Sequence, residues 1–169
     1  MSDFDDIVGP VEQSFPRMRH KKAKKQKMRP EDELHGTVAK FLTRIIAPAG
    51  WISEYEVMWF SIEMRNSGRT ITTRNGTRVN LEGARRKAFG CISGVPDINI
   101  IYQGRYYGIE LKAQQDKERG IKAGVVSTAQ KETHVVLRAA GAATGIARSL
   151  EQVLALLDEW DIPHKRVSL

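Results

Sequence analysis

The sequence DINIIYQGRYYGIELK, residues 97–112, indicates the fold most directly, because two apolar strands flank a short polar turn. The apolar positions are Ile98, Ile100 and Tyr102 in the first strand and Tyr107, Ile109 and Leu111 in the second. Side chains that face each other across an antiparallel pair lie on the same side of the sheet, so both sets are buried together only if paired residue numbers have an odd sum. A two-residue turn gives such sums. It is either Gln103-Gly104 or Gly104-Arg105, and the second has the glycine-first order of a type II′ turn.

The same register predicts a polar cluster on the opposite face of this hairpin. Asp97 and Asn99 come to lie beside Glu110 and Lys112, within one or two strand spacings of about 4.8 Å. Two close carboxylates repel each other and favour a shared proton or a bound cation. Hard oxygen ligands suit Mg²⁺, and the Lys112 ammonium can hold a water or balance charge on a phosphate. A solvated polar sheet face has the same composition, because such residues are common on exposed strands.

Upstream of the hairpin, the sequence predicts a helix followed by a strand. Pro30 suits the first position of a helix, and the acidic residues 31–33 are favourably placed in its first turn. Apolar residues at helical spacing continue as far as Ile46, and Pro48 ends the helix. Residues 51–60 alternate apolar and polar side chains, which predicts a strand.

Residues 61–90 differ from the rest of the chain in being both basic and β-prone. Asn75-Gly76 is a strong hairpin signal, and the strand-forming residues on either side of it predict a hairpin over 70–80 that projects from the core. Residues 83–89 are compatible with a short helical turn or a loop. The basic side chains of this segment are Arg65, Arg69, Arg74, Arg78, Arg85, Arg86 and Lys87.

Downstream of the decisive stretch, two helices and a strand complete the pattern. After a polar loop over 113–126, Ser127 caps a helix that runs to Gly141, and residues 143–147 form a short strand. The sequence SLEQ, residues 149–152, is a capping box that opens the last helix. The predicted order is α-β-(β-hairpin)-β-β-α-β-α.

Length and composition limit the protein class. A chain of 169 residues with 41% hydrophobic side chains suits one compact domain and excludes wholesale disorder. Its longest apolar stretch is well short of the roughly 18 residues that span a bilayer, and the single cysteine, Cys91, excludes an internal disulfide or a Cys-rich zinc site. Because residues 1–6 are acidic and do not resemble a signal peptide, we expect a soluble, intracellular protein.

The net charge of +7 is concentrated in two segments. Residues 1–30 carry eight basic and four acidic side chains, and residues 61–96 carry seven and two. This distribution favours a polyanionic partner. The density of like charge over 1–29 predicts a disordered arm, which either attracts phosphates or only solubilises the terminus.

The motif GVPD, residues 94–97, followed by IELK, residues 109–112, resembles the Pro-Asp…(Asp/Glu)-x-Lys signature of the PD-(D/E)XK nucleases. The Ser127-x-x-Gln130 pair and the later Gly141 are similar to the virus-type replication-repair nuclease branch, the VRR-NUC domain. The resemblance implies an α/β fold with a restriction-endonuclease-like core of order α-β-β-β-α-β and a mixed sheet flanked by helices. It covers 91–160 well and 31–60 loosely, so we expect a nuclease domain over 30–160, with the basic hairpin of 61–90 as an insertion and 161–169 as a C-terminal tail.

The resemblance also implies roles for individual residues. Asp97 and Glu110 become metal ligands, with the Leu111 main-chain carbonyl as a further one, and Lys112 becomes the catalytic lysine. The remaining assignments are Glu33 as an acid on the first helix that completes the metal site, with Glu31 and Asp32 as alternatives, and Gln130 as the glutamine that approaches the site from the second helix. Residues His35 and His134 are not assigned.

From the resemblance we expect a Mg²⁺- or Mn²⁺-dependent DNA endonuclease, acting as a homodimer on branched DNA such as four-way junctions. The basic segment, with Arg69, Arg74, Arg78, Arg85, Arg86 and Lys87, is expected to grip the nucleic-acid backbone. No membrane and no small organic cofactor is expected, and the location is cytoplasmic or nucleoid-associated in a bacterial or phage-infected cell. The alternatives are a non-catalytic nucleic-acid-binding module and an RNA-directed nuclease.

Overall fold

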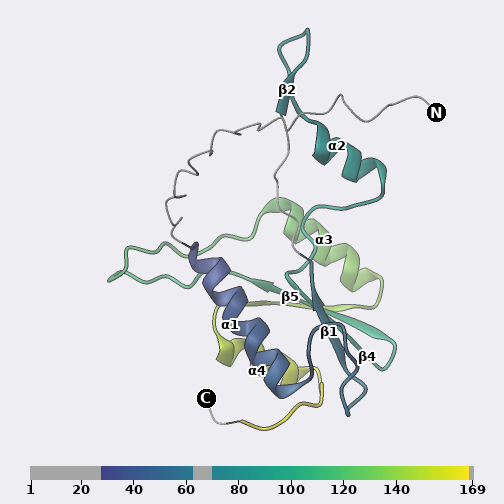
Figure 1. Cartoon of the computed structure of the whole chain (residues 1–169), viewed down its shortest axis with the longest axis vertical. Helices are drawn as coiled ribbons and strands as arrows, with labels where there is room; N and C mark the ends of the chain where they lie inside the picture. The colour runs from purple at the N-terminus through teal and green to yellow at the C-terminus, as the bar shows by residue number, and fades with distance from the viewer. Residues whose placement is uncertain (1–27, 63–69, 168–169) are drawn as a thin grey trace, which may run out of the picture.

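The computed structural model describes residues 28–62 and 70–167, which form a four-stranded mixed sheet flanked by helices, with a separate two-stranded hairpin (Figure 1). The helices are α1 (Pro30–Ile45), α2 (Leu81–Ala88), α3 (Thr128–Ala139) and α4 (Leu150–Glu159). The strands are β1 (Met58–Ser61), β2 (Thr70–Thr72), β3 (Arg78–Asn80), β4 (Ile98–Tyr102), β5 (Arg105–Leu111) and β6 (Ala143–Ala147). The predicted α/β class and element order are confirmed, with α2 as an additional helix.

The sheet has the order β1-β4-β5-β6, in which β5 and β6 are parallel and the other neighbours are antiparallel. Ile98 pairs with Ile109, so paired residue numbers have the odd sum that the apolar pattern requires. The turn is Gln103-Gly104, and both residues have positive φ, 47° and 69°. Two positive φ angles with glycine second are typical of a type I′ turn, so the Gly104-Arg105 option is wrong.

The two faces of the sheet have different coverings. The apolar face packs against α1 and α4, which contribute Val38, Leu42, Val153 and Leu157 to the buried core. On the polar face, α3 lies over the sheet, and the Arg138 guanidinium donates to the Thr144 hydroxyl at 2.9 Å. The site described below forms on this polar face.

The strand expected over 51–60 is wrong for its first seven residues, because β1 begins at Met58. The Ser53 hydroxyl accepts hydrogen bonds from the backbone N–H groups of Tyr55 and Val57, both at 3.2 Å. Such a local side-chain acceptor competes with strand pairing and favours a turn. Among the alternating apolar side chains of this segment, Val57 and Trp59 are buried, while Tyr55 is only partly so.

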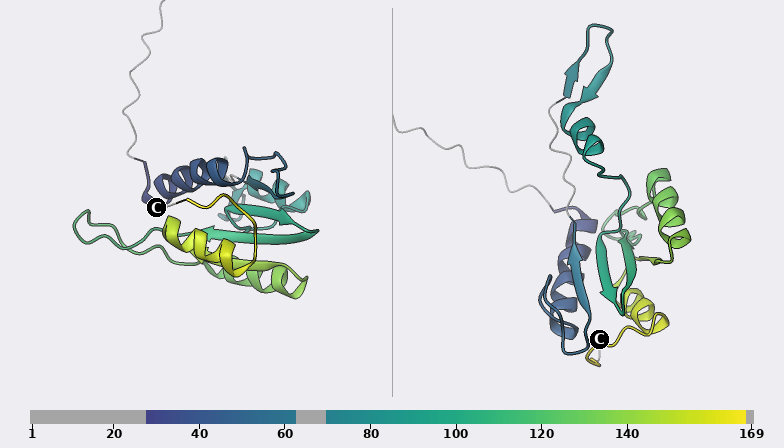
Figure 2. Two further views of the ribbon diagram at one scale, coloured as in Figure 1. Left: turned by 90° about the horizontal axis from the view of Figure 1, so that it is seen from below. Right: turned by 90° about the vertical axis from the view of Figure 1, so that its right-hand side faces the viewer.

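The predicted hairpin at 70–80 is confirmed, and its turn has Gly76 at φ 76°. It continues directly into α2, whose N-cap Asn80 accepts from the Gly83 N–H, so a helix forms where a turn or loop was expected. We refer to residues 70–90 as the basic arm. It extends away from the rest of the molecule (Figure 2), and α2 buries none of its side chains.

The chain after α4 returns to the core. Ile162 is buried, and the Lys165 N–H donates to the Ile45 carbonyl at 2.8 Å, so the predicted tail packs on the domain as far as Val167. The disordered arm predicted for 1–29 lies outside the described residues apart from its last two. Within the described ranges, no helix has the length and apolar character needed to cross a membrane.

Candidate active site

The register of β4 and β5 brings Asp97 and Glu110 to neighbouring positions. Asp97 directly precedes β4 and Glu110 lies one residue before the end of β5, so the pairing of Ile98 with Ile109 continues to this pair. Lys112 follows β5 on the same face as Glu110 and is tied to β6 by its N–H, which donates to the Ala147 carbonyl at 2.9 Å. The predicted polar cluster is therefore present, except that Asn99 has other partners.

Asn99 lies on this face but not in the cluster. Its side chain is fully buried, donates to the Pro96 carbonyl at 3.2 Å and accepts from the Tyr106 hydroxyl at 2.5 Å. It thereby fixes the loop before Asp97.

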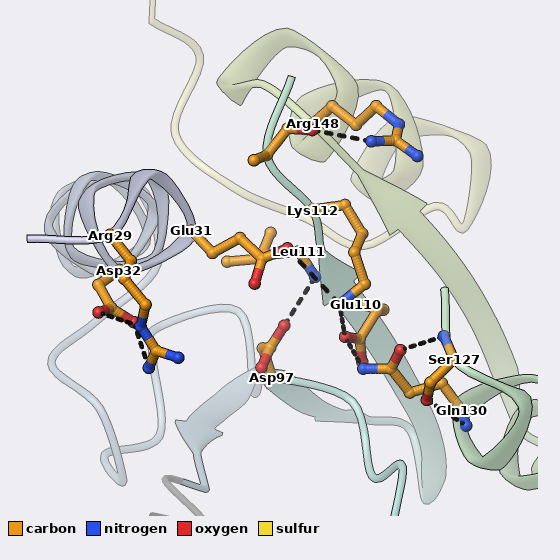
Figure 3. A network of polar contacts seen from close by, with 11 residues as sticks. Arg29, Glu31, Asp32, Asp97, Glu110, Leu111, Lys112, Ser127, Gln130 and Arg148 are labelled. Atoms are coloured by element: carbon orange, nitrogen blue, oxygen red, sulfur yellow. Dashed lines mark hydrogen bonds and ion pairs between the residues drawn. The ribbon is translucent and has the colours of Figure 1, made fainter. Parts of the chain in front are cut away.

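Glu110 is the centre of the cluster, and it is only 1% exposed. Its Oε1 accepts a hydrogen bond from the Lys112 ammonium at 2.6 Å and a second from the Gln130 side-chain amide (Figure 3). Its Oε2 is buried and has no hydrogen-bond partner among the described residues. One carboxylate oxygen thus accepts two hydrogen bonds, while the other has lost its hydration and accepts none from the described residues.

Burial raises the pKa of the Glu110 carboxyl from 4.5 to about 7. The hydrogen bond and charge of Lys112 lower the pKa, while the neighbouring carboxylates Asp97 and Glu31 raise it. Desolvation prevails because the orphaned oxygen has nothing to replace its hydration.

Lys112 is 6% exposed, so its ammonium lies in the interior between acidic groups. Besides Glu110, its Nζ lies 4.0 Å from a carboxylate oxygen of Glu31. A buried ammonium needs such partners, because an unpaired buried charge costs several kcal/mol, on the order of 3–5. The position therefore holds a cation beside the carboxylates of Glu110 and Glu31.

Asp97 is half-buried, and its Oδ2 accepts from the Leu111 N–H at 2.8 Å. The N–H and C=O groups of one strand residue point to the same side. The Leu111 carbonyl is accordingly directed to the side of β5 on which Asp97 lies.

Gln130 has two roles at the start of α3. Its side-chain oxygen accepts from the Ser127 N–H at 2.8 Å, which completes a capping box with the Ser127 hydroxyl, and its amide nitrogen donates to Glu110. The cap fixes the side chain, and the fixed side chain orients the carboxylate. The approach of Gln130 that the resemblance implied is present.

The first-helix acid beside the site is Glu31 and not Glu33, which corrects the assignment made from the resemblance. Glu33 points to the loop after β5 and pairs with Arg119 at 3.1 Å, while Asp32 pairs with Arg29 at 3.1 Å. Figure 3 shows Glu31 directed toward Leu111 and Lys112. Consecutive helix residues differ in direction by about 100°, and the sequence does not determine which of three adjacent acids faces the sheet.

Two residues of the site were not identified from the sequence. A Cβ on Gly124 would lie 2.6 Å from a Glu31 oxygen and 2.9 Å from the Ala113 nitrogen, so only glycine lets this loop close over the site. The signal was a glycine in a polar loop, which by itself is common. His134, four residues after Gln130 on α3, is buried with an Nε2 that has no partner among the described residues. Burial lowers the pKa of His134, and the charges of Arg138 and Lys112 act in the same direction.

The donor set fits a small hard cation. A divalent ion compensates the environment of the buried Glu110 Oε2, which has no partner within residues 28–62 and 70–167 and lies near the Asp97 carboxylate. No group of three or more His, Cys, Asp or Glu side chains that could hold a metal occurs in the described ranges. Mg²⁺ is commonly held by one or two carboxylates with water and substrate oxygens. The two carboxylates fit Mg²⁺ or Mn²⁺ better than a metal that needs several side-chain ligands.

The basic arm and the polar cluster are separate features of the structure. Exposed cations in the arm are Arg74, Arg78, Arg85 and Lys87, while Arg86 pairs with Glu82 at 2.9 Å. Two of the predicted basic residues, Arg65 and Arg69, lie outside the described residues. The tip of the arm points away from the sheet, and its base continues through residues 90–96 to Asp97 (Figures 1 and 2).

Comparison with known proteins identifies the architecture. No protein-family model and no curated protein matches the chain. A solved structure described as a VRR_NUC domain protein matches 80% of this chain and 90% of its own, with a TM-score of 0.53 and 19% sequence identity. The chain has a VRR_NUC fold. The VRR_NUC resemblance is thus confirmed for the fold, including the restriction-endonuclease-like core with its mixed sheet between helices.

Proposed function

We propose that the protein is a divalent-metal-dependent DNA endonuclease that hydrolyses phosphodiester bonds. The observation that carries the proposal is the buried Glu110 carboxylate near Asp97 and the Lys112 ammonium, with one oxygen that has no partner in the described part of the chain. A polar face that served only for solvation would expose these groups, whereas Glu110 and Lys112 are almost completely buried. The VRR_NUC fold supports the same chemistry.

Each residue of the cluster has a role in such a reaction. Asp97 and Glu110 would hold Mg²⁺ or Mn²⁺, with the Leu111 carbonyl as a further ligand. A bound metal ion supplies Lewis acidity and lowers the pKa of water. Lys112 places a positive charge and hydrogen-bond donors where a phosphate would become more negative. Gln130 holds Glu110 in orientation and leaves Oε2 free for the cation.

The proposed substrate is branched DNA, and the proposed assembly is a homodimer. The exposed cations of the basic arm support a polyanionic substrate, because contacts to phosphates position a nucleic acid without reading its sequence. The resemblance to the VRR-NUC branch supports paired cuts by two copies of the chain.

Cleavage of a DNA panel tests the proposal. Linear, forked and four-way DNA and a matched RNA are incubated with Mg²⁺, Mn²⁺ or chelator. Lys112→Met and Asp97→Asn are expected to lose activity by about 100-fold or more, whereas Lys122→Met and Asp161→Asn at exposed positions retain it. Binding of Mn²⁺ by calorimetry should be lost in Glu110→Gln.

The same panel contains the results that would refute the nuclease. Activity that survives both site substitutions rules out this site. DNA binding that is equal in chelator, with no cleavage of any substrate, establishes the non-catalytic binding module. Preferential cleavage of the matched RNA would show an RNA-directed nuclease.

A second pair of variants tests the choice between adjacent helix acids. Glu31→Gln is expected to reduce activity by about 10-fold, because Glu31 helps hold the Lys112 ammonium. Glu33→Gln should change activity by less than about twofold, since Glu33 pairs with exposed Arg119 and surface pairs contribute little. A larger loss in Glu33→Gln than in Glu31→Gln would restore the original assignment.

A further inference from the structure

An exposed aromatic ring stands at the base of the basic arm, on the chain segment that leads to Asp97. Phe89 is the C-cap residue of α2 and is 72% exposed. The Arg85 guanidinium lies 5.3 Å from the centre of its ring. Leaving a phenylalanine in water forgoes the free energy of burying it, so such a ring is well suited to a ligand with an apolar face.

The segment after Phe89 is fixed to the helix that carries Gln130. The Thr133 hydroxyl donates to the Ser93 carbonyl at 2.7 Å, and Gly94, at φ 82°, packs directly on the backbone of Ala129. Phe89 therefore lies within four residues, at most about 14 Å of chain, of an anchor on the first turns of α3. Phe89 therefore lies at the end of the arm from which the chain continues to Asp97.

The chain on either side of Phe89 carries cationic and apolar side chains and borders a surface depression. Lys87 and residues 90–93 line a surface depression of about 480 Å³ with Ala129, Glu132 and Thr133 of α3. Ile92 on this segment is 54% exposed. Cations on the arm attract phosphates, while the exposed ring and Ile92 offer apolar contact.

An unpaired nucleotide combines the two properties that this surface recognises, a phosphate and a planar base with free faces. In a continuous duplex the base faces are already stacked on one another. We propose that Phe89, with Arg85, is a stacking platform for an unpaired base of a DNA strand, so that the protein selects DNA in which duplex gives way to single strand. This inference rests on the proposed function and adds to it the feature of the substrate that is recognised.

A second copy of the chain is a less suitable occupant of this surface. A twofold interface would place the same patch against itself. It would then bring Arg85 and Lys87 of both copies together, and like charges oppose such contact.

DNA binding in chelator tests the platform without requiring catalysis. One DNA is a duplex with a central single-stranded gap, in which an unpaired base opposite the gap is the fluorescent analogue 2-aminopurine. It is compared with a continuous duplex of the same length. Phe89→Ala is expected to weaken binding of the gapped DNA by about 5-fold to 100-fold and to abolish the fluorescence change, with the continuous duplex altered by less than about twofold. Phe89→Trp should preserve both signals, and Trp51→Ala, which removes a 70% exposed ring in the segment between α1 and β1, should change neither.

Three outcomes would overturn the platform. These are equal weakening of both DNAs by Phe89→Ala, no effect on either, or a change from dimer to monomer with the preference for gapped DNA intact. Binding is measured in chelator and does not require cleavage. If Phe89→Ala selectively weakens binding of gapped DNA but the wild-type protein cleaves no DNA, the nuclease proposal is refuted and the stacking platform is supported. A protein that cleaves DNA without the effect would do the reverse.

Discussion

The two carboxylate oxygens of Glu110 have different environments with opposite effects on its pKa. Its Oε1 receives two hydrogen bonds, from Lys112 and Gln130, which stabilise the ionised form, while its Oε2 is buried with none from the described residues. The cost of burying the second oxygen raises the pKa of Glu110 to about 7. Such a carboxylate favours binding of a cation, because the positive charge offsets the loss of hydration at the buried oxygen.

A pH dependence of stability follows from this residue. The raised pKa of Glu110 means that the folded protein keeps a proton that the unfolded chain releases above pH 4.5. The free energy of unfolding without metal should therefore fall as the pH rises from about 4.5 to about 7, and the Glu110 contribution should level off above that window. Urea unfolding in chelator at several pH values measures this fall.

The Glu110→Gln variant is the control. Its side chain does not titrate, so its free energy of unfolding should fall less than that of the wild-type protein between about pH 4.5 and about pH 7. Mg²⁺ should reduce the fall in the wild-type protein, since a divalent ion favours the ionised carboxylate. A wild-type profile that matches the variant across this window would contradict the assigned protonation.

At the scale of elements, three segments meet at the site through positions that tolerate no side chain. Gly94 lies against the backbone of α3, and a Cβ on Gly108 in β5 would lie 2.6 Å from Pro96. Gly124 lets the loop after β5 approach α1 and Lys112, and its N–H donates to the Ala113 carbonyl at 2.8 Å. The loop that contains Gly124 therefore lies beside the Lys112 side chain because its backbone packs closely against the backbone of Ala113.

Gly124→Ala tests this close approach. The added methyl group meets backbone at Ala113 and the Glu31 carboxylate, so we expect a stability loss of about 1–3 kcal/mol. Activity should fall by about 10-fold to 100-fold, because Lys112 would be displaced. Gly36→Ala on α1 is the matched control, since nothing lies within 4 Å of its Cβ, and it should stabilise the protein by about 0.5–1 kcal/mol. Thermal melts and cleavage rates measure both variants, and full activity in Gly124→Ala would contradict the role of the loop.

At the scale of the whole molecule, the basic arm and the hydrophobic core occupy different parts of the structure. The core lies between α1, α4 and the apolar face of the sheet, whereas the basic arm contributes nothing to it. An isolated two-stranded hairpin and an eight-residue helix are marginally stable by themselves. We therefore expect the proposed nucleic-acid partner, when bound, to increase the order of the arm.

The salt dependence of DNA binding separates the arm from the net charge. Replacing Arg74, Arg78 and Lys87 by Gln should reduce the slope of log Kd against log salt by about 3, at roughly 0.9 per lost phosphate contact. Replacing Lys40, Arg44 and Arg166, which are also exposed, removes the same charge elsewhere and should leave the slope nearly unchanged. Equal changes in the two triple variants, measured by fluorescence anisotropy, would show that only net charge matters.

Much of the fold follows from local signals in the chain. The alternation of residues 97–112 predicts the central hairpin and its register, and Ser127 and Ser149 mark the starts of α3 and α4. Asp97, Glu110 and Lys112 were predicted to converge because strand periodicity of two leaves only one face for them. Residues 51–57 were mispredicted, because a single serine hydroxyl diverts the backbone from the strand that the alternation favours.

The sequence alone predicts the β4–β5 hairpin, its two faces and the gathering of Asp97, Glu110 and Lys112 on one of them, since these depend on periodicity and turn chemistry between neighbouring residues. Contacts between distant segments show that Glu31, and not Glu33, approaches Lys112, that Gly124 closes the loop, and that one oxygen of Glu110 is buried with no partner among the residues that the structure describes. The physical reason is that helix rotation, loop approach and desolvation arise from packing between distant segments. Their consequences appear only when the segments are in contact.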